Sequence, residues 1–456
     1  MLWGVLLSTP LFAETSHNTP NIVIVLADDL GWGDVGFHGS NIKTPCLDNL
    51  VNEGVELTRF YTAPISTPTR AGLLTGRYPN RFGFRTAVIP PWRKDGLDVN
   101  EETLADLLGR NGYKNRAIIG KWHLGHTYVE HYPMSRGFTH FYGHLNGAID
   151  YFTHEREGEL DWHNDWESCY DKGYSTELIT AEAVRCIKEY RQDGPFFMYV
   201  AYNAPHTPLM AQEKDIKEYC DNYDELTPAE QKKVTYKAMV SCMDRGVGEI
   251  VKTLKEQGIM DNTLFLFFSD NGAALGPSGA SSGKLRGGKF SEWDGGVRAP
   301  AILYWKDGET YYKNISSQLT GFVDVVPTIK ELVGDKSKPV REYDGMSMMP
   351  VLDGRQKRIS REFYLGCGAI VSDDYKFIKK KFSHLNLKDS YLVDYKNDPY
   401  EKENARNKYP NVVKRLSDAA LKYDTITPCI PEVDYGKGKN NFKAPKEWDV
   451  VGKHFK

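Results

Sequence analysis

Four oxygen-bearing side chains closely follow two short apolar runs of the sequence. Asp28 and Asp29 come after the run IVIVL, and Asp270 and Asn271 come after the run LFLFF. Such a set, without His or Cys, suits hard cations, so it favours Ca²⁺ first and Mg²⁺ second. Three carboxylates in one pocket would repel each other unless a metal ion neutralised them. Each pair alone is also a common turn sequence, and only their shared place after two apolar runs favours a metal site.

The next candidate site residue is a serine. Ser66 opens the segment STPTR, which precedes a predicted helix over residues 71–75 that ends at Gly76. Pro68 suits a first helical turn, and Ser66 would lie at the positive N-terminal end, where backbone N–H groups can hold an anion. A plain serine cap before a proline is the ordinary alternative.

Two further apolar runs lead into basic or titratable side chains. RAIIG precedes Lys121 and His123, and FFMYVAY precedes His206. A single histidine is more often structural. Open α/β sheets, however, bind ligands beyond the C-terminal ends of their strands, so four such runs predict one shared site.

These motifs resemble the formylglycine-dependent sulfatases of the alkaline-phosphatase superfamily. The segment STPTRAGLLTGR is similar to the signature of that family. Five other blocks are similar to family motifs and stand in the family's order along the chain: ADDLGWGDVGFHGS, GKWHLG, NAPHTP, SDNGA and GGKFSEWDGGVRAP. Together they span most of residues 21–350. The resemblance implies an α/β fold, with a large mixed sheet sandwiched by helices and a smaller C-terminal antiparallel sheet plus helix.

The resemblance also implies a role for each matching residue. Ser66 occupies the place of the residue oxidised to formylglycine, whose hydrate is both nucleophile and metal ligand. Asp28, Asp29, Asp270 and Asn271 would complete the Ca²⁺ sphere. The remaining matches in the sulfate pocket are Arg70, which holds the hydrate, together with Lys121, His123, His206 and Lys289.

The chemistry of sulfate-ester hydrolysis needs these residue types. Cations must stabilise the sulfate oxygens, which suits Arg70, Lys121 and Lys289. A gem-diol on a metal is a better nucleophile than a serine hydroxyl, because coordination lowers its pKa. We expect His206 to protonate the departing alcohol and His123 to act as the base that releases sulfate, with the reverse assignment open.

Serine at position 66 departs from most of the family, which carries Cys there. It marks either the Ser-type class, oxidised by a radical maturase in some bacteria, or an engineered Cys-to-Ser change, in which case formylglycine would derive from Cys. An unmodified Ser66 should leave a protein that binds substrate and turns it over hardly at all.

Several blocks are similar to the arylsulfatase B, or N-acetylgalactosamine-4-sulfatase, branch. The loop over residues 143–157 is expected to line the sugar side of the pocket, with Asp150, His154 and Arg156 as candidate contacts to sugar hydroxyls or a neighbouring anion. Solvated loop polar groups explain these three equally well. The resemblance predicts hydrolysis of 4-O-sulfate from galactose or N-acetylgalactosamine in a carrageenan-type galactan, or in chondroitin or dermatan sulfate.

Two other functions compete with this prediction. One is a phosphatase or phosphodiesterase of the same superfamily, with unmodified Ser66 as nucleophile and two zinc ions. Asn271 after Asp270, and the lack of a following DxxxH-like block, disfavour it. The other is a catalytically silent protein that binds sulfated glycans.

The elements that must position these residues alternate between apolar runs and helices. Helices are predicted over residues 101–111, 176–191 and 238–258. The sequence becomes basic over residues 355–361 and then shows short strand-like segments. We therefore predict an N-terminal tail (1–20), a catalytic domain (21–354) and a C-terminal subdomain (355–456). The subdomain should contain strands at EFYLG, YKFIKKK and DSYLVDY and a helix over residues 412–423.

The composition limits the classes of protein to which this chain can belong. The 456 residues include 58 Lys and Arg against 61 Asp and Glu, a net charge of −3, and 40% are hydrophobic. Disorder and nucleic-acid binding are therefore disfavoured, and no window approaches the ~18 apolar residues of a membrane span. The first thirteen residues resemble the end of a secretory signal without a basic region, which predicts a periplasmic or secreted protein that meets a formylglycine-generating maturase. The seven cysteines contain no CxxC pair, and their pairing stays open.

Overall fold

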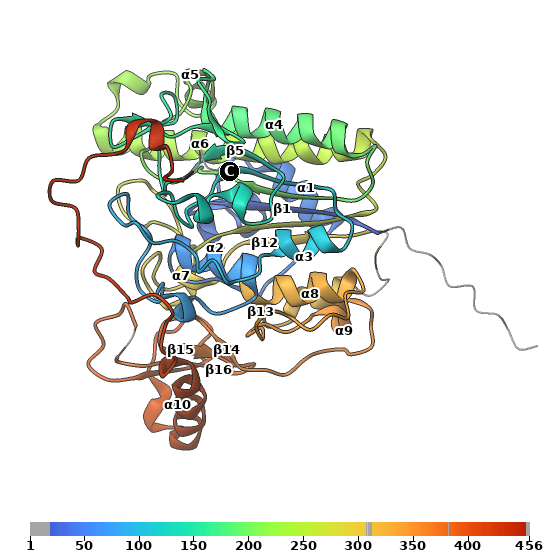
Figure 1. The fold of residues 1–456 in the computed structure, drawn as a ribbon. Helices are drawn as coiled ribbons and strands as arrows, with labels where there is room; N and C mark the ends of the chain where they lie inside the picture. The colour runs from blue at the N-terminus through green and yellow to red at the C-terminus, as the bar shows by residue number, and fades with distance from the viewer. Residues whose placement is uncertain (1–18, 307, 309–311, 382, 453–456) are drawn as a thin grey trace, which may run out of the picture.

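A computed structural model describes residues 19–452, except 307, 309–311 and 382 (Figure 1). The predicted export signal falls on residues that lie outside this described part. Over the residues it does describe, no helix is both long and apolar enough to cross a membrane.

A nine-stranded mixed sheet forms the centre of the molecule. Its strands, in spatial order, are β2 (Val55–Glu56), β12 (Ala301–Tyr304), β11 (Thr263–Ser269), β1 (Asn21–Ala27), β10 (Phe196–Ala201), β4 (Asn115–Lys121), β5 (His140–His144), β8 (His163–Asn164) and β9 (Glu167–Ser168). The four predicted strands are β1, β4, β10 and β11, and they are confirmed as adjacent parallel neighbours. Their C-terminal ends therefore meet at one edge of the sheet, as the sequence predicted.

Helices cover both faces of this sheet (Figure 1). The structure contains α1 (Pro45–Glu53), α2 (Ser66–Thr75), α3 (Leu104–Arg110), α4 (Ser175–Tyr190), α5 (Glu213–Lys217), α6 (Pro228–Glu256), α7 (Asp294–Val297), α8 (Val325–Leu332), α9 (Met349–Leu352) and α10 (Pro410–Asp424). Alternate residues of β1 face opposite layers, since Ile22 and Ile24 pack in one hydrophobic cluster and Val23 and Val25 in the other. The first cluster includes residues of α2, α3 and α8, and the second includes residues of α1, α4 and α6.

Three predicted helix starts differ from the structure for local reasons. The helix predicted to begin at residue 101 begins at Leu104, because Thr103 and Asp106 form a reciprocal capping box. The helix predicted from residue 238 begins at Pro228 behind the same kind of box, formed by Thr227 and Glu230. The helix predicted from residue 71 already begins at Ser66, since proline is tolerated in a first turn.

The C-terminal residues form the expected antiparallel sheet and helix. Its strands are β14 (Phe363–Tyr364), β15 (Ala369–Val371), β16 (Tyr375–Ile378) and β17 (Tyr391–Asp394), of which β15 was not predicted. Two small ribbons complete the structure, β3 (Phe60–Tyr61) with β13 (Thr320–Gly321) and β6 (Glu155–Arg156) with β7 (Glu159–Leu160). The α/β class with a large mixed sheet and a smaller C-terminal sheet is thus confirmed.

The C-terminal sheet is joined to the larger part by buried contacts. Phe363 lies in one hydrophobic cluster with Tyr61 and Phe322 from before residue 355. The buried Lys376 ammonium lies 2.6 Å from Asp294 and 2.7 Å from Glu401. The predicted division at residue 355 therefore crosses a shared core and stays a prediction.

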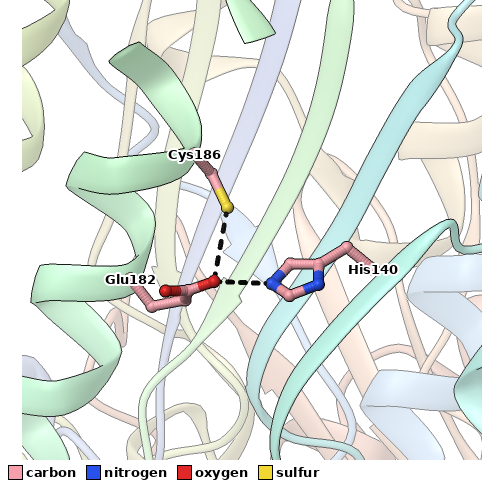
Figure 2. A group of neighbouring side chains, drawn as sticks. All are labelled: His140, Glu182 and Cys186. Atoms are coloured by element: carbon pink, nitrogen blue, oxygen red, sulfur yellow. Dashed lines mark hydrogen bonds and ion pairs between the residues drawn. The ribbon is translucent and has the colours of Figure 1, made fainter. Parts of the chain in front are cut away.

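At the start of β5, His140 lies between the carboxylates of Asp165 and Glu182, and Figure 2 shows its contact with Glu182. Its Nδ1 is 2.7 Å from Asp165, and its Nε2 is 2.6 Å from Glu182 on α4. Cys186 donates to the same Glu182 oxygen at 3.7 Å. Burial acts to lower the pKa of His140, but the hydrogen bonds outweigh it and raise this pKa from 6.5 to about 11. At neutral pH His140 is therefore a cation that fastens α4 to strand β5.

We predict that His140→Gln lowers the free energy of unfolding by about 3 kcal/mol near pH 6, because two carboxylates lose a buried cationic partner. Since the folded-state pKa is raised, this stabilisation is complete below pH 6.5 and disappears as pH rises towards 11. Urea unfolding of both proteins across that range measures the difference. Lys188→Gln, at an exposed position of α4, is the control and should change the free energy of unfolding by at most ~0.5 kcal/mol. A difference that did not change with pH would contradict this assignment.

Candidate active site

The predicted site residues gather at the C-terminal edge of the parallel strands. Asp28 and Asp29 follow β1, Lys121 ends β4, and Asp270 and Asn271 follow β11. Parallel pairing sets Ala27 of β1 beside Ser269 of β11, and this register brings the two acidic pairs together. Asp28, Asp29, Asp270 and Asn271 are all buried.

Ser66 and Arg70 are held against Asp270. The Ser66 hydroxyl donates to Asp270 Oδ2 at 2.6 Å, and Arg70 Nε donates to Ser66 Oγ at 2.9 Å. Arg70 also donates through its terminal nitrogen to Asp270 Oδ2 at 2.9 Å. Positions 66 and 70 are one helical turn apart on α2, so both side chains face the same pocket. The nucleophile candidate thus lies directly between a buried carboxylate and a buried guanidinium.

Two lysines face the other two carboxylates. Lys121 Nζ donates to Asp28 Oδ2 at 2.5 Å, and Lys289 Nζ donates to Asp29 Oδ2 at 2.9 Å. Burial acts to raise the pKa of Asp29, yet Lys289 lowers it. For Asp270, the nearby Arg70 and Lys121 overcome burial and likewise lower the pKa. An ammonium offers three donors, so each lysine keeps hydrogen-bonding capacity for an anion.

The donor set has two features that fit a bound cation. Asp28 Oδ1 and Asn271 Oδ1 are buried and accept no hydrogen bond from the described residues. Burial raises the pKa of Asp28 to about 8 despite the neighbouring Lys121, so this carboxylate lacks sufficient compensating positive charge. A hard divalent cation would satisfy the unused oxygens and restore the charged form. The residues present therefore fit a Ca²⁺ site of the predicted composition.

The two predicted catalytic histidines each have one ring nitrogen bonded to a backbone carbonyl. His123 Nε2 is 3.1 Å from the Ile89 carbonyl, and His206 Nδ1 is 2.6 Å from the Thr207 carbonyl. Those nitrogens must carry the proton, which leaves His123 Nδ1 and His206 Nε2 with free lone pairs. Burial and nearby cations lower the pKa of both rings, that of His206 to about 3. His206 Nε2 lies 3.6 Å from Asp29, so this ring borders the metal ligands.

A cavity of about 670 Å³ opens above this pocket. Ser66, Lys121, His123, His206 and Lys289 all contribute to its wall. A sulfate group at the bottom would therefore meet the nucleophile candidate and both lysines, while the attached molecule occupied the wider part.

Of the three predicted sugar contacts, only one lines the cavity in the structure. Arg156 lines the cavity. Asp150 instead accepts hydrogen bonds from the backbone N–H groups of Phe152 and Thr153, both at 2.8 Å, and thereby caps its own turn. His154 is buried against Trp162, with ring centroids 4.5 Å apart. Neither Asp150 nor His154 lines the cavity, so the structure supports a substrate role only for Arg156.

Sequence reasoning missed two aromatic residues of the cavity wall. Phe290 and Tyr435 line it, and their side chains are 59% and 51% exposed. Phe290 directly follows Lys289, so its position next to a predicted site residue could have identified it from the sequence. Tyr435 lies far along the chain in a stretch without regular structure, and no local pattern distinguishes it.

Comparison with known proteins agrees with this arrangement. The family model described as Sulfatase matches residues 20–335. The chain belongs to the sulfatase family. Mouse arylsulfatase J is 34% identical over 349 residues, which cover 74% of this chain and 56% of that protein. Mouse N-acetylgalactosamine-6-sulfatase is 34% identical over 373 residues, which cover 76% of this chain and 69% of that protein. The chain thus spans little more than half the length of arylsulfatase J.

Solved structures share the fold over most of this chain. The crystal structure of Ps i-CgsB in complex with k-i-k-neocarrahexaose has a TM-score of 0.79 at 30% identity and covers 92% of this chain and 96% of that one. The phosphonate monoester hydrolase of Agrobacterium radiobacter shares the fold at 19% identity, with a TM-score of 0.60. Because a 6-sulfatase is among the relatives, the predicted 4-sulfatase branch stays a prediction.

We predict that Ca²⁺ raises the free energy of unfolding of this protein and that Asp28→Asn removes most of the gain. At a Ca²⁺ concentration 100 times the dissociation constant, binding to the folded state alone contributes about 2.7 kcal/mol. Thermal unfolding with and without chelator, together with elemental analysis, measures both effects. Asp261→Asn, which removes a charge outside the pocket, should leave them unchanged. Full calcium content and stabilisation in Asp28→Asn would overturn the ligand assignment.

Proposed function

We propose that this sulfatase family member hydrolyses sulfate esters of a sulfated glycan. The observation that carries the proposal is the wall of a large cavity on which Ser66, held by the buried Arg70, lies together with Lys121 and Lys289. The size of the cavity supports a substrate larger than sulfate, and the Ps i-CgsB structure holds a neocarrahexaose in a related fold.

Asp28, Asp29, Asp270, Asn271 and residue 66 would hold the Ca²⁺ ion, and Ser66 would be the residue oxidised to formylglycine. When present, the ion would neutralise the carboxylates and the sulfate, and formylglycine would supply a gem-diol nucleophile. Oxidation requires a maturase that recognises the segment around Ser66. We propose that the protein meets this partner on its way to the periplasm or the medium.

The basic side chains orient the reacting groups. Arg70 Nε, 2.9 Å from Ser66 Oγ, fixes the oxygen of residue 66 in the pocket. Lys121 and Lys289, each anchored to one carboxylate, have donors left for the sulfate oxygens. Because both ammonium groups are held before substrate binds, little reorganisation is needed when charge develops in the transition state.

The two histidines would transfer the protons of the reaction. We assign His206 to the departing alcohol, because its side chain is 19% exposed and lines the cavity where that alcohol would lie. Its Nε2 carries no proton in the free pocket, so His206 must first take one up there, which the negative charge of a bound sulfate favours. We assign His123, which is more deeply buried, to the base that accompanies sulfate release. The free Nδ1 of His123 can accept a proton while the Ile89 carbonyl fixes the ring.

We propose a 4-O-sulfated galactose or N-acetylgalactosamine as the sugar, in a carrageenan-type galactan or in chondroitin or dermatan sulfate. The similarity of several blocks to the arylsulfatase B branch supports this choice. An axial O4 sends the ring away from the sulfate at a different angle from an equatorial one, so a rigid wall can distinguish them.

Mass spectrometry of the peptide across Ser66, taken from the native host, tests the proposed function together with an assay on sulfated oligosaccharides. We expect a loss of about two mass units, as for oxidation of a hydroxyl to an aldehyde, and release of sulfate. An unmodified peptide from a preparation that hydrolyses phosphate esters instead would replace the sulfatase proposal by the phosphatase alternative.

We predict that Lys121→Ala and Lys289→Ala each reduce the rate of sulfate release by about 100-fold or more, because removal of one preorganised donor typically costs ~3 kcal/mol. Steady-state kinetics of the matured enzyme measure the loss, and circular dichroism checks the fold. Lys252→Ala on the surface of α6 is the matched control and should retain full activity. Near-normal rates in either pocket variant would place that lysine outside the sulfate site.

We predict faster hydrolysis of 4-O-sulfated than of 6-O-sulfated galacto-oligosaccharides. Donors placed for one geometry are left unpaired by the other, at ~1–3 kcal/mol per buried group. The ratio of the two kcat/KM values for the matured enzyme is the measurement. Equal values, or a preference for 6-O-sulfate, would remove the branch assignment and leave the sulfatase chemistry intact.

A further inference from the structure

The chain beyond α10 crosses back over the larger part of the molecule (Figure 1, red). We call residues 425–452 the C-terminal strap. Its contacts are spread along its length: Cys429 N–H to the Arg81 carbonyl at 2.9 Å, Arg85 to Glu432 at 3.1 Å, Trp92 Nε1 to the Tyr435 carbonyl at 2.7 Å, and Trp448 Nε1 to the Arg156 carbonyl at 3.0 Å. The strap is therefore fixed at both sides of the cavity rather than free to move across it.

This anchoring holds Tyr435 at the cavity wall. Its ring packs edge-on against Trp92, with centroids 5.2 Å apart, while 51% of the side chain stays exposed. A fixed backbone with a half-exposed ring gives a flat apolar surface at low entropic cost. The apolar C–H face of a sugar ring is the kind of surface that such a ring can cover.

Phe290 combines an unusual backbone conformation with an exposed side chain. It has a φ of +65°, a conformation that bulky residues rarely adopt, and 59% of its side chain is exposed. Its N–H donates to the Pro64 carbonyl at 3.0 Å, so the loop is held in this form. Strained backbone beside a catalytic residue, here Lys289, is typical of a position that serves ligand binding.

Arg156 adds a positive charge to the same wall. Its Nε is buried and has no hydrogen-bond partner among the described residues, and its terminal nitrogen lies 3.4 Å from Glu157, whose side chain is 41% exposed. Trp448 of the strap holds the Arg156 backbone in place. The Arg156 side chain is 26% exposed and lines the cavity, so the terminal nitrogens of its guanidinium are suited to bind an anionic group there.

We propose that Phe290, Tyr435 and Arg156 form a second sugar subsite, completed by the C-terminal strap, for the residue next to the sulfated sugar that reacts. The two aromatic rings cover the apolar faces of this neighbour, and Arg156 binds a sulfate or carboxylate on it. The proposal rests on the proposed function. It predicts that the protein distinguishes an anionic oligosaccharide from a sulfated monosaccharide.

Calorimetric titration of the full-length protein with unmodified Ser66 tests the subsite without turnover. The probes are a 4-O-sulfated galactose monosaccharide and three galacto-disaccharides that carry the same sulfate, with a neighbour that bears a sulfate, a carboxylate or no charge. We expect the disaccharides with an anionic neighbour to bind more tightly than the monosaccharide. Comparison of the sulfated with the carboxylated neighbour identifies which anion the subsite takes.

Two variants test the charged part and the aromatic part of the subsite separately. Arg156→Gln should reduce the advantage of the charged over the neutral disaccharide by about 10- to 100-fold, as expected for one charge-assisted hydrogen bond. Tyr435→Ala should reduce the advantage of every disaccharide over the monosaccharide, and Tyr435→Trp should restore it. Tyr400→Ala, an exposed aromatic residue outside the cavity, is the control and should change neither ratio.

The outcomes distinguish the subsite from the function on which it rests. Unchanged ratios in both variants, or an equal loss for monosaccharide and disaccharides, would overturn the subsite while sulfated sugars still bound. A wild-type protein that bound none of the sulfated probes would overturn the proposed function and the subsite together. Loss of folding in Tyr435→Ala, seen by circular dichroism, leaves Arg156→Gln and Tyr435→Trp as the deciding variants.

Discussion

Three buried carboxylates, Asp28, Asp29 and Asp270, lie at the ends of adjacent strands, and each is in contact with a basic side chain. An unpaired charge in such a place would cost several kcal/mol, so the position of each cation is tightly constrained. Even so, burial keeps the pKa of Asp28 near 8. The pocket therefore has ion pairs sufficient for folding and still has oxygen atoms available for one more cation.

The parallel sheet makes this arrangement possible. Side-by-side pairing of β11, β1, β10 and β4 places residues from four distant parts of the sequence at one edge. Helix α2 contributes Ser66 from its first turn and Arg70 from the next, and a loop brings Lys289 to Asp29. Strand ends and the first turns of α2 thus hold most of the proposed sulfate pocket, whereas loops and the strap build the outer wall of the cavity. In the proposed function, the residues for chemistry and those for selectivity come from different parts of the fold.

The C-terminal residues contribute to the site in two ways. Lys376 of β16 pairs with Asp294 and Glu401, which fastens the small sheet to the segment that follows Lys289. Beyond α10, the strap returns to the cavity and places Tyr435 there. Residues on both sides of position 355 therefore line the cavity, and the predicted division there stays a prediction.

The four central strands and the polar residues that follow them could be predicted from local signals, since apolar runs specify buried strands and parallel pairing brings their ends together. The proposed roles of Arg70 and Lys289 came instead from the resemblance of their motifs to the family. Three features became visible only in the folded chain: Asp150 caps a turn, His154 packs on Trp162, and Tyr435 reaches the cavity. Loop conformation depends on contacts between residues far apart in the chain, such as Trp92 with Tyr435, and hydrophobic periodicity carries no information about such contacts.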